Sequence, residues 1–332
     1  MIVKKLLSIF LISALALPLA RSVTAVTKTL GDNEFQYLVF GLDDAANNTD
    51  VIIALTYDVS LNSVSVVQIP RDTYCSYGSE NKKINHLYSH FRHLGLEEKE
   101  AFAKTTEFIG NQLGVRFDGY VAITTEGFRN AVDAIGGVKV MLNENFVYES
   151  ADPSKSFTLP AGENTLNGKQ AEIFVRHRNS YVTGDLGRLD TQKIFIEGVF
   201  DTISSFNGYS ELFVGLRKIQ KNVTTDFSIS ELLTVILKHS SKFKALDVCY
   251  LTMPGQALED KSGIWFYALN RASCEEIAEK YMSSSSEFDK DRKFLNADDS
   301  RFRDIYYRDK FEYKVYTSKQ LDDIKIPKTT ER

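Results

Sequence analysis

Two kinds of apolar segment alternate along this chain, and this alternation most strongly limits the folds it can adopt. The segments Phe35–Phe40, Val51–Tyr57 and Val64–Ile69 are compact and rich in β-branched residues, which is typical of strands. Residues 96–113 instead place apolar side chains at helical spacing and stop at Gly114. Strands and helices mixed in this way predict a layered α/β sandwich.

The same alternation continues to about residue 204. The connection over residues 58–62 has the length of a hairpin, which predicts that the two strands flanking it pair. Further predicted strands are Gly119–Thr124 and Val138–Leu142, and further predicted helices are Thr125–Ile135, Asn167–Arg176 and Asp185–Ser204.

Composition excludes some classes of protein. With 332 residues, of which 43% are hydrophobic, the chain can bury a substantial core. Its net charge of −4 argues against a general nucleic-acid-binding protein. The cysteines, Cys75, Cys249 and Cys274, are too few for a disulfide scaffold. Cys249 and Cys274 would either pair in an oxidising compartment or remain free buried thiols.

The N-terminus predicts export. Lys4 and Lys5 precede the uncharged run Leu6–Ala20, so residues 1–28 are interpreted as a signal peptide or an N-terminal membrane anchor. The run is shorter than the roughly 20 residues that span a bilayer, and Val23–Ala25 offers a small-residue cleavage site. The lysines would stay in the cytoplasm. The body would then lie at the extracytoplasmic face of the cell membrane, or be secreted after cleavage.

The C-terminus differs in composition from the body. The serines Ser283–Ser286 separate a predicted domain over residues 32–282 from a tail over residues 283–332. The tail is dense in both signs of charge and in aromatic residues, and its alternation over Phe311–Val315 is that of a strand. A solvated extension and a packed appendage both fit this composition.

Arginines and acids recur where predicted strands and helices begin or end. Arg71 follows a strand that ends at Pro70, and Arg176 and Arg178 would face the same way on an extended segment. Guanidinium forks suit phosphate oxygens because they offer planar, paired and permanently charged donors. Asp43 and Asp50 flank one short loop, so both would reach one metal that bridges the phosphates.

A second group of polar residues supports the same interpretation. Asp185 opens a predicted helix, where a carboxylate caps or a phosphate docks. Arg188 and Gln192 share a face of that helix, and Lys83 adds a cation. The simpler alternative is a set of turn residues, caps and internal ion pairs. The pattern as a whole favours a polyanion site, above all one for a diphosphate.

Six ordered segments resemble the LytR-CpsA-Psr family over about residues 35–205. They are Ile69–Thr73, Lys83–Asn85, Gly127–Val138, Leu166–Ala171, Val175–Arg178 and Gly184–Arg188. The resemblance implies a three-layer α/β/α sandwich with a central mixed sheet and an apolar groove for a lipid. It also implies an extracytoplasmic phosphotransferase that moves a glycopolymer, such as teichoic acid or capsular polysaccharide, from a polyprenyl diphosphate carrier to peptidoglycan. The implied partners are therefore this lipid-linked glycopolymer, peptidoglycan and the membrane surface, with no nucleic acid.

The resemblance also implies roles for individual residues. Asp43 and Asp50 would be the metal-side carboxylates for Mg²⁺ (or Mn²⁺). Asp185 would be the base, or the group that orients the attacking sugar hydroxyl. The residues that would bind the diphosphate are Arg71, Lys83, Arg176, Arg178, Arg188 and Gln192, and among them Arg71, Arg176 and Arg178 would also be catalytic.

The chain departs from the family pattern at three places. Ala45 stands where the family carries an arginine, and Thr49–Val51 replaces Ser-Asp-Thr. Three histidines lie within His86–His93, a segment better interpreted as a surface helix or groove wall than as a metal site. Two other functions stay open: a hydrolase of lipid diphosphates (a pyrophosphatase), and a non-catalytic envelope protein that binds such lipids or regulates assembly.

Overall fold

The computed structural model describes most of the predicted body of the chain. It covers residues 34–77, 80–178, 185–204, 223–227, 246–282, 300–306, 308–321, 324 and 326. The predicted signal or anchor segment, residues 1–28, lies outside the described residues. Within the described ranges, no helix is both long enough and apolar enough to cross a membrane.

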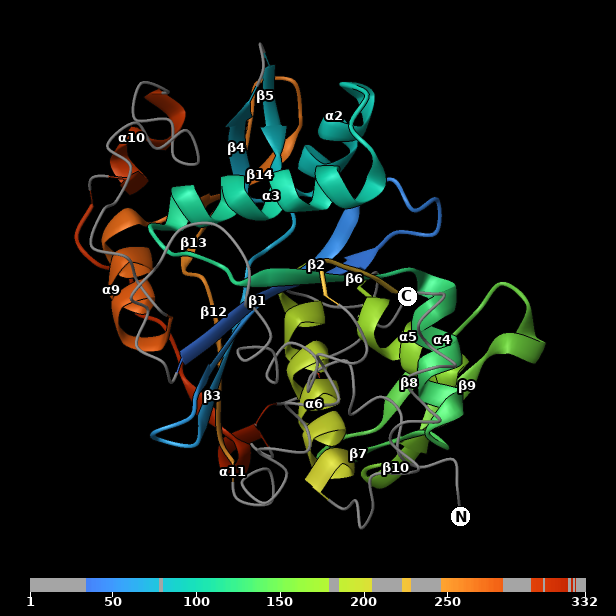
Figure 1. The fold of residues 1–332 in the computed structure, drawn as a ribbon. Helices are drawn as coiled ribbons and strands as arrows, with labels where there is room; N and C mark the ends of the chain where they lie inside the picture. Colours follow the sequence, from blue (N-terminus) through green and yellow to red (C-terminus); the bar gives the residue numbers. More distant parts are fainter. Residues whose placement is uncertain are drawn as a thin grey trace.

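A seven-stranded mixed sheet forms the centre of the molecule (Figure 1). Its strands, in spatial order, are β11 (Val223–Thr225), β6 (Gly119–Ile123), β1 (Glu34–Leu42), β2 (Thr49–Asp58), β3 (Ser63–Gln68), β12 (Asp247–Thr252) and β15 (Tyr316–Thr317). Strands β1, β2 and β3 pair antiparallel, whereas β6 runs parallel to β1 and β12 parallel to β3. The predicted hairpin between β2 and β3 is confirmed.

Helices cover both faces of this sheet. One face carries α4 (Thr125–Ala134), α5 (Gly168–Arg176) and α6 (Asp185–Ser204); the other carries α2 (Leu87–His93), α3 (Glu98–Leu113) and α9 (Arg271–Tyr281). A hydrophobic core lies on each face of the sheet, and alternate residues of β1 pack into one core or the other. Tyr37 packs on the α6 side, and Leu38 packs on the α3 side. The predicted three-layer α/β/α sandwich is therefore confirmed.

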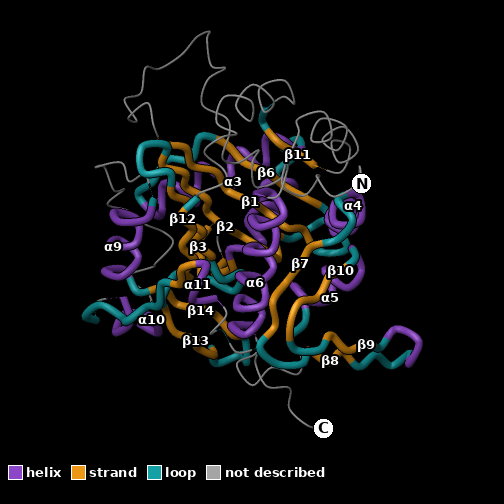
Figure 2. The backbone as a smooth tube through the Cα atoms, turned by 90° about the horizontal axis from the view of Figure 1, so that it is seen from below, coloured by secondary structure: helices purple, strands orange, loops and turns teal. Residues whose placement is uncertain are grey.

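Smaller elements extend the helical layers. The paired strands are β4 (Tyr74–Tyr77) with β5 (Glu80–Lys83), β7 (Val138–Leu142) with β10 (Gly162–Leu166), β8 (Phe146–Tyr148) with β9 (Phe157–Leu159), and β13 (Gly255–Glu259) with β14 (Trp265–Leu269). The short helices are η1 (Ile84–His86), η2 (Pro153–Lys155), α10 (Ser300–Tyr306) and α11 (Ser318–Leu321). Figure 2 shows α6 lying across the central strands, with β7 beside it.

Local sequence signals explain where the helices of the site begin and end. Asn167 caps α5 through a capping box with Gln170, which satisfies backbone donors at both residues. Gly114 ends α3 with φ of 68°, a left-handed conformation that glycine adopts without strain. Gly198 lets α6 approach β7, since a Cβ there would lie 2.0 Å from the carbonyl oxygen of Lys139. This close approach fixes α6 against its neighbours.

The described part of the tail packs against the body. The side chain of Asn270 donates to the carbonyl of Ile305, and the Ser273 hydroxyl bonds both the N–H and the carbonyl of Phe311. The predicted strand over residues 311–315 is wrong, because Ser273 takes the backbone groups of Phe311 that a strand would need. Pairing with β12 begins only at Tyr316.

Each of the three cysteines carries a thiol and forms no disulfide. Cys75 and Cys274 are buried and Cys249 is partly buried, so the free-thiol alternative holds and Cys249 does not pair with Cys274. Burial raises the pKa of Cys249 above its ordinary value.

Candidate functional site

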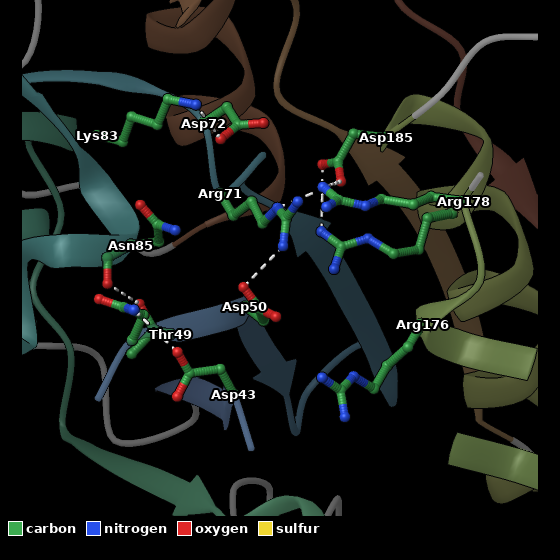
Figure 3. A network of polar contacts seen from close by, with 12 residues as sticks. Asp43, Thr49, Asp50, Arg71, Asp72, Lys83, Asn85, Arg176, Arg178 and Asp185 are labelled. Atoms are coloured by element: carbon green, nitrogen blue, oxygen red, sulfur yellow. Dashed lines mark hydrogen bonds and ion pairs between the residues drawn. The ribbon is translucent and has the colours of Figure 1, made fainter. Parts of the chain in front are cut away.

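Arg71 lies in the loop that follows β3, just beyond the C-terminal end of that strand (Figure 3). The loop is fixed because the N–H and the hydroxyl of Thr73 both donate to the carbonyl of Pro70. Arg71 Nη1 lies 2.8 Å from Asp50 Oδ1, and Arg71 Nε lies 3.3 Å from Asp185 Oδ1. Burial lowers the pKa of Arg71, but the carboxylates of Asp185 and Asp50 outweigh burial and raise it overall.

Asp185, the first residue of α6, lies among three arginines. Its carboxylate is 3.1 Å from Arg188 Nη2, 3.3 Å from Arg71 Nε and 3.9 Å from Arg178 Nη1. Arg188 is 2% exposed, and this burial lowers the pKa of its guanidinium, an effect that Asp185 only partly offsets. The prediction that Arg71, Arg178, Asp185 and Arg188 come together from distant segments is therefore supported by the geometry.

Arg71, Arg178, Asp185 and Arg188 together form the arginine cluster, which contains buried polar atoms that lack a hydrogen bond. Among the described side chains, the cluster members with such atoms are Arg71 (Nε), Asp185 (Oδ1) and Arg188 (Nε); outside the cluster they are Asn85 Oδ1 and Thr106 Oγ1. Arg71 Nε and Asp185 Oδ1 attract each other as charges but without hydrogen-bond geometry. Unused donors on two buried guanidinium groups are costly, and an anionic ligand would satisfy them.

Arg176 contradicts the expectation of an extended arginine pair. It is the last residue of α5, and Arg178 lies beyond the helix, after the extended His177. Its guanidinium binds Asp44 through two contacts, of 2.6 and 3.1 Å, and Glu172 at 2.9 Å. Arg176 and Arg178 therefore contact different acids, because the end of the helix turns the chain between them.

Sequence reasoning missed both acids that bind Arg176. Glu172 stands four residues before Arg176 on one helix, a spacing that would have predicted the pair. Asp44 is 132 residues away in sequence, and no local pattern indicates its contact. Asp44 directly precedes Ala45, the position where the resemblance leads one to expect an arginine.

The other predicted residues border the cluster. Lys83 Nζ lies 2.8 Å from a carboxylate oxygen of Asp72, the residue after Arg71. Asp43 accepts hydrogen bonds from the Asn47 N–H and the Asn48 side chain, so it shapes its own loop. Figure 3 shows Asp43 and Asp50 on the same side of the cluster, below Arg71.

The residues suit a hard divalent cation but do not form a closed metal site. Among the described residues, no group of three or more histidine, cysteine, aspartate or glutamate side chains comes together as metal ligands. Asp43 and Asp50 nonetheless supply carboxylate oxygens, the donors that Mg²⁺ prefers, and a metal of this kind keeps several waters or phosphate oxygens of its own. The magnesium site stays a prediction.

An apolar cavity of about 140 Å³ adjoins the cluster on the α6 side of the sheet. Its aliphatic and aromatic wall comes mainly from β1, β2, α4 and α6, with Val39, Val51, Ile53, Phe128, Phe195, Ile196 and Val199. The polar part of its wall includes Asp50, Glu172, Arg176 and Gln192. Gln192 is held there by donating to the carbonyl of Val175. The cavity therefore has a mostly apolar wall that also includes charged side chains of the candidate site, among them Asp50 and Arg176.

The sequence profile of the LytR_cpsA_psr family matches residues 16–283, most of the chain. The chain belongs to this family. A relative from Bacillus anthracis, named polyisoprenyl-teichoic acid–peptidoglycan teichoic acid transferase TagU, is 30% identical over 251 residues, 73% of this chain and 76% of TagU. TagU of Bacillus subtilis is 27% identical over 75% of this chain and 78% of its own length. The family resemblance expected from the motifs is thereby confirmed.

Solved structures agree on the fold. The crystal structure of B. subtilis TagV covers 76% of this chain and 98% of TagV with a TM-score of 0.62 at 24% identity. Lin1025 from Listeria innocua covers 75% of this chain and 97% of its own with a TM-score of 0.55 at 27% identity. The family fold therefore extends over about three quarters of the chain.

The contact between Asp44 and Arg176 predicts a titration. The hydrogen bond from Arg176 holds the pKa of Asp44 below its ordinary value of about 3.9. Because the folded-state pKa is depressed, the ion pair contributes to the free energy of unfolding above about pH 3.9. This contribution is lost as the pH falls through the folded-state pKa. A carbon-detected NMR titration of the Asp44 carboxyl should give a pKa below the ordinary value of an aspartate. In Arg176→Gln the pKa should return toward the ordinary value, and an unchanged pKa would rule out the pairing.

Proposed function

We propose that this chain is an extracytoplasmic phosphotransferase that moves a glycopolymer from a polyprenyl diphosphate carrier to peptidoglycan. The observation that carries the proposal is the apolar cavity whose polar wall includes Asp50 and Arg176, beside the unsatisfied guanidinium donors of Arg71 and Arg188. A lipid diphosphate has both matching parts, an apolar chain and a polyanionic head. The names of the TagU relatives and a structure of TagT bound to LIIa-WTA, similar in fold with a TM-score of 0.60, support this substrate class.

In this mechanism the protein acts mainly by positioning and by charge. Arg71, Arg178 and Arg188 bind the diphosphate oxygens with fixed donors, which stabilises the charge that spreads over the transferred phosphoryl group. Asp43 and Asp50 would hold Mg²⁺ (or Mn²⁺), which when bound neutralises charge on the diphosphate. Arg176 and Lys83 would contribute from the edge of the site.

The transfer itself exchanges one phosphorus–oxygen bond for another. A sugar hydroxyl of peptidoglycan forms a bond to the phosphorus that carries the glycopolymer, and the bond from that phosphorus to the bridging oxygen breaks. Polyprenyl phosphate leaves with the bridging oxygen. The hydroxyl proton passes to Asp185, which is free to accept it once diphosphate oxygens have replaced its carboxylate at Arg71 and Arg178.

The proposed location follows from the substrate. A polyprenyl carrier lies in a membrane, so the site must work at the membrane surface on its outer side. The lysines and the apolar run within residues 1–28 would place the chain there as an anchor, or export it if cleaved.

A reconstitution tests the proposed reaction. The full-length protein is incubated with a lipid diphosphate-linked sugar, magnesium and a peptidoglycan oligomer, and the products are analysed by mass spectrometry. Sugar phosphate attached to peptidoglycan supports the transferase. Free sugar phosphate would instead identify a hydrolase. If the donor stays intact while it still binds, the chain is a non-catalytic binding protein.

Filling the apolar cavity should weaken binding of long-chain donors. Val39 lines the cavity from β1 and is only partly buried, so Val39→Phe places a ring in that space. Losing the burial of two methylene groups costs about 1.6 kcal/mol, which is roughly tenfold in the Michaelis constant. The measurement compares the Michaelis constants of wild type and variant for donors whose polyprenyl chains differ in length. An equal loss for a short, water-soluble donor would show that the cavity does not hold the lipid, and thermal melting checks the fold.

A further inference from the structure

A second cleft lies against a different face of α6. Its volume is about 240 Å³, and α6 contributes Leu186, Leu189, Asp190 and Lys193, none of which lines the apolar cavity. The opposite walls come from β12 to β14, including Thr252 and Tyr267, and from the tail segment 311–316. The family profile ends at residue 283, so the tail wall lies outside the part of the chain that the family shares.

This second space, the glycan cleft, differs in its chemistry from the arginine cluster. Its lining combines aromatic rings with side chains of both charge signs. Lys193, 5% exposed, pairs with Asp190 at 2.8 Å and lies 5.5 Å from the ring centre of Tyr316. Charges already balanced within the wall do not favour a phosphate. The mixed lining does not favour a purely apolar chain either.

Sugar rings match such a lining. A hexose presents an apolar face of C–H groups, which packs on aromatic rings, and a rim of hydroxyls that donate to carboxylates and accept from ammonium groups. Tyr267, Phe311, Tyr313 and Tyr316 supply the rings, and the exposed Glu312 and Lys314 supply polar groups beside them. Binding pockets of this composition typically fix a ligand by a few polar contacts within an aromatic wall.

The glycan cleft is connected to the candidate site through the loop after β3 and through the start of α6. The N–H of Tyr267 donates at 2.8 Å to the carbonyl of Asp72, the residue next to Arg71. Leu186, at the cleft, directly follows Asp185 in α6. The buried amide of Gln68 donates both to the Leu189 carbonyl at 2.9 Å and to Gln192 at 3.3 Å, so one side chain contacts the walls of both spaces.

We infer that the glycan cleft binds the acceptor, an amino-sugar strand of peptidoglycan, and directs its hydroxyl toward Asp185. The inference rests on the proposed transferase function. It assigns the donor and the acceptor to two faces of one helix, with the reaction at the helix's first residue. It also gives the tail a role, because residues 311–316 form one wall of the acceptor site.

Glycan binding without any donor tests this inference. The probe is a peptide-free, β-1,4-linked GlcNAc–MurNAc tetrasaccharide, titrated into the full-length protein and followed by saturation-transfer NMR. Tyr316→Ala should weaken binding about tenfold, the worth of one aromatic stack. Tyr316→Phe keeps the ring and should bind as the wild type does. The double variant Glu312→Ala/Lys314→Ala, at exposed positions, should also weaken binding without loss of thermal stability.

Two controls separate this inference from the proposed function. Arg71→Ala should bind the tetrasaccharide as tightly as the wild type, because Arg71 does not line the cleft. Absence of binding to the wild type at millimolar glycan overturns the inference, and so does binding that Arg71→Ala abolishes but the cleft variants leave unchanged. If the wild type binds the glycan but does not react with the lipid diphosphate donor, the proposed transferase function is refuted. The assignment of the cleft as a glycan site then still stands.

Discussion

Replacing Arg71 by alanine is expected to reduce transfer from the lipid diphosphate donor by a factor of about 100 to 1,000. Arg71 is the side chain that contacts Asp50 on the predicted metal side and Asp185 at the proposed base, and its Nε has no hydrogen bond. Its loss therefore removes a fixed donor at the reacting phosphates. Single-turnover rates at saturating donor measure this effect apart from binding.

Two matched variants make the Arg71 result specific. Arg71→Lys keeps the charge but loses the planar fork, so it should restore only a small part of the rate. Lys139→Ala removes a cation of β7 that pairs with Glu163 of β10 on the surface, away from the cluster, and should leave the rate unchanged. Wild-type turnover in Arg71→Ala would refute the assignment of the arginine cluster as the site of phosphoryl transfer.

Replacing Asp185 by asparagine should cost both activity and stability. The change keeps the shape of the side chain but leaves Arg71 and the buried Arg188 without the carboxylate that they share. Breaking a buried ion pair costs about 3 kcal/mol at the low end of measured values. The free energy of unfolding should fall by about this amount in urea titrations. Transfer should be lost across the accessible pH range, because an amide cannot accept the proton.

An added anion provides the control for Asp185→Asn. Pyrophosphate should bind the arginines that have lost their carboxylate and raise the stability of the variant more than that of the wild type. A double variant, Arg188→Met with Asp185→Asn, should respond to pyrophosphate less. If pyrophosphate stabilises wild type and Asp185→Asn equally, Asp185 does not compete with anions for the arginines.

The sequence predicted the fold because its periodic signals are strong and local. The strands β1, β2 and β3 and the helices α3 to α6 lie where the spacing of apolar residues places them. Asn167 begins α5 through local hydrogen bonds, and Gly114 ends α3 through its positive φ. The order of the motifs identified the family, and the arginines and acids at the ends of predicted elements independently indicated an anion site that includes Asp185.

Other features depend on contacts between distant segments, which no local pattern encodes. Asp44 meets Arg176 only because the β1–β2 loop and the end of α5 lie at the same edge of the sheet. The apolar cavity is lined by residues that look like core residues in the sequence, because burial and ligand contact call for the same side chains. Residues 311–315 alternate like a strand, but Ser273 already bonds the backbone of Phe311.

The short strand β15 has a consequence for the solubility of the protein. It pairs with β12 through only Tyr316 and Thr317, and it lies at one border of the seven-stranded sheet. Without it, the six residues of β12 would present unpaired amide and carbonyl groups to neighbouring molecules. Such an edge is a template for intermolecular strand pairing, whereas two residues are too few to extend it. The C-terminal segment thus covers part of an edge that would otherwise favour aggregation.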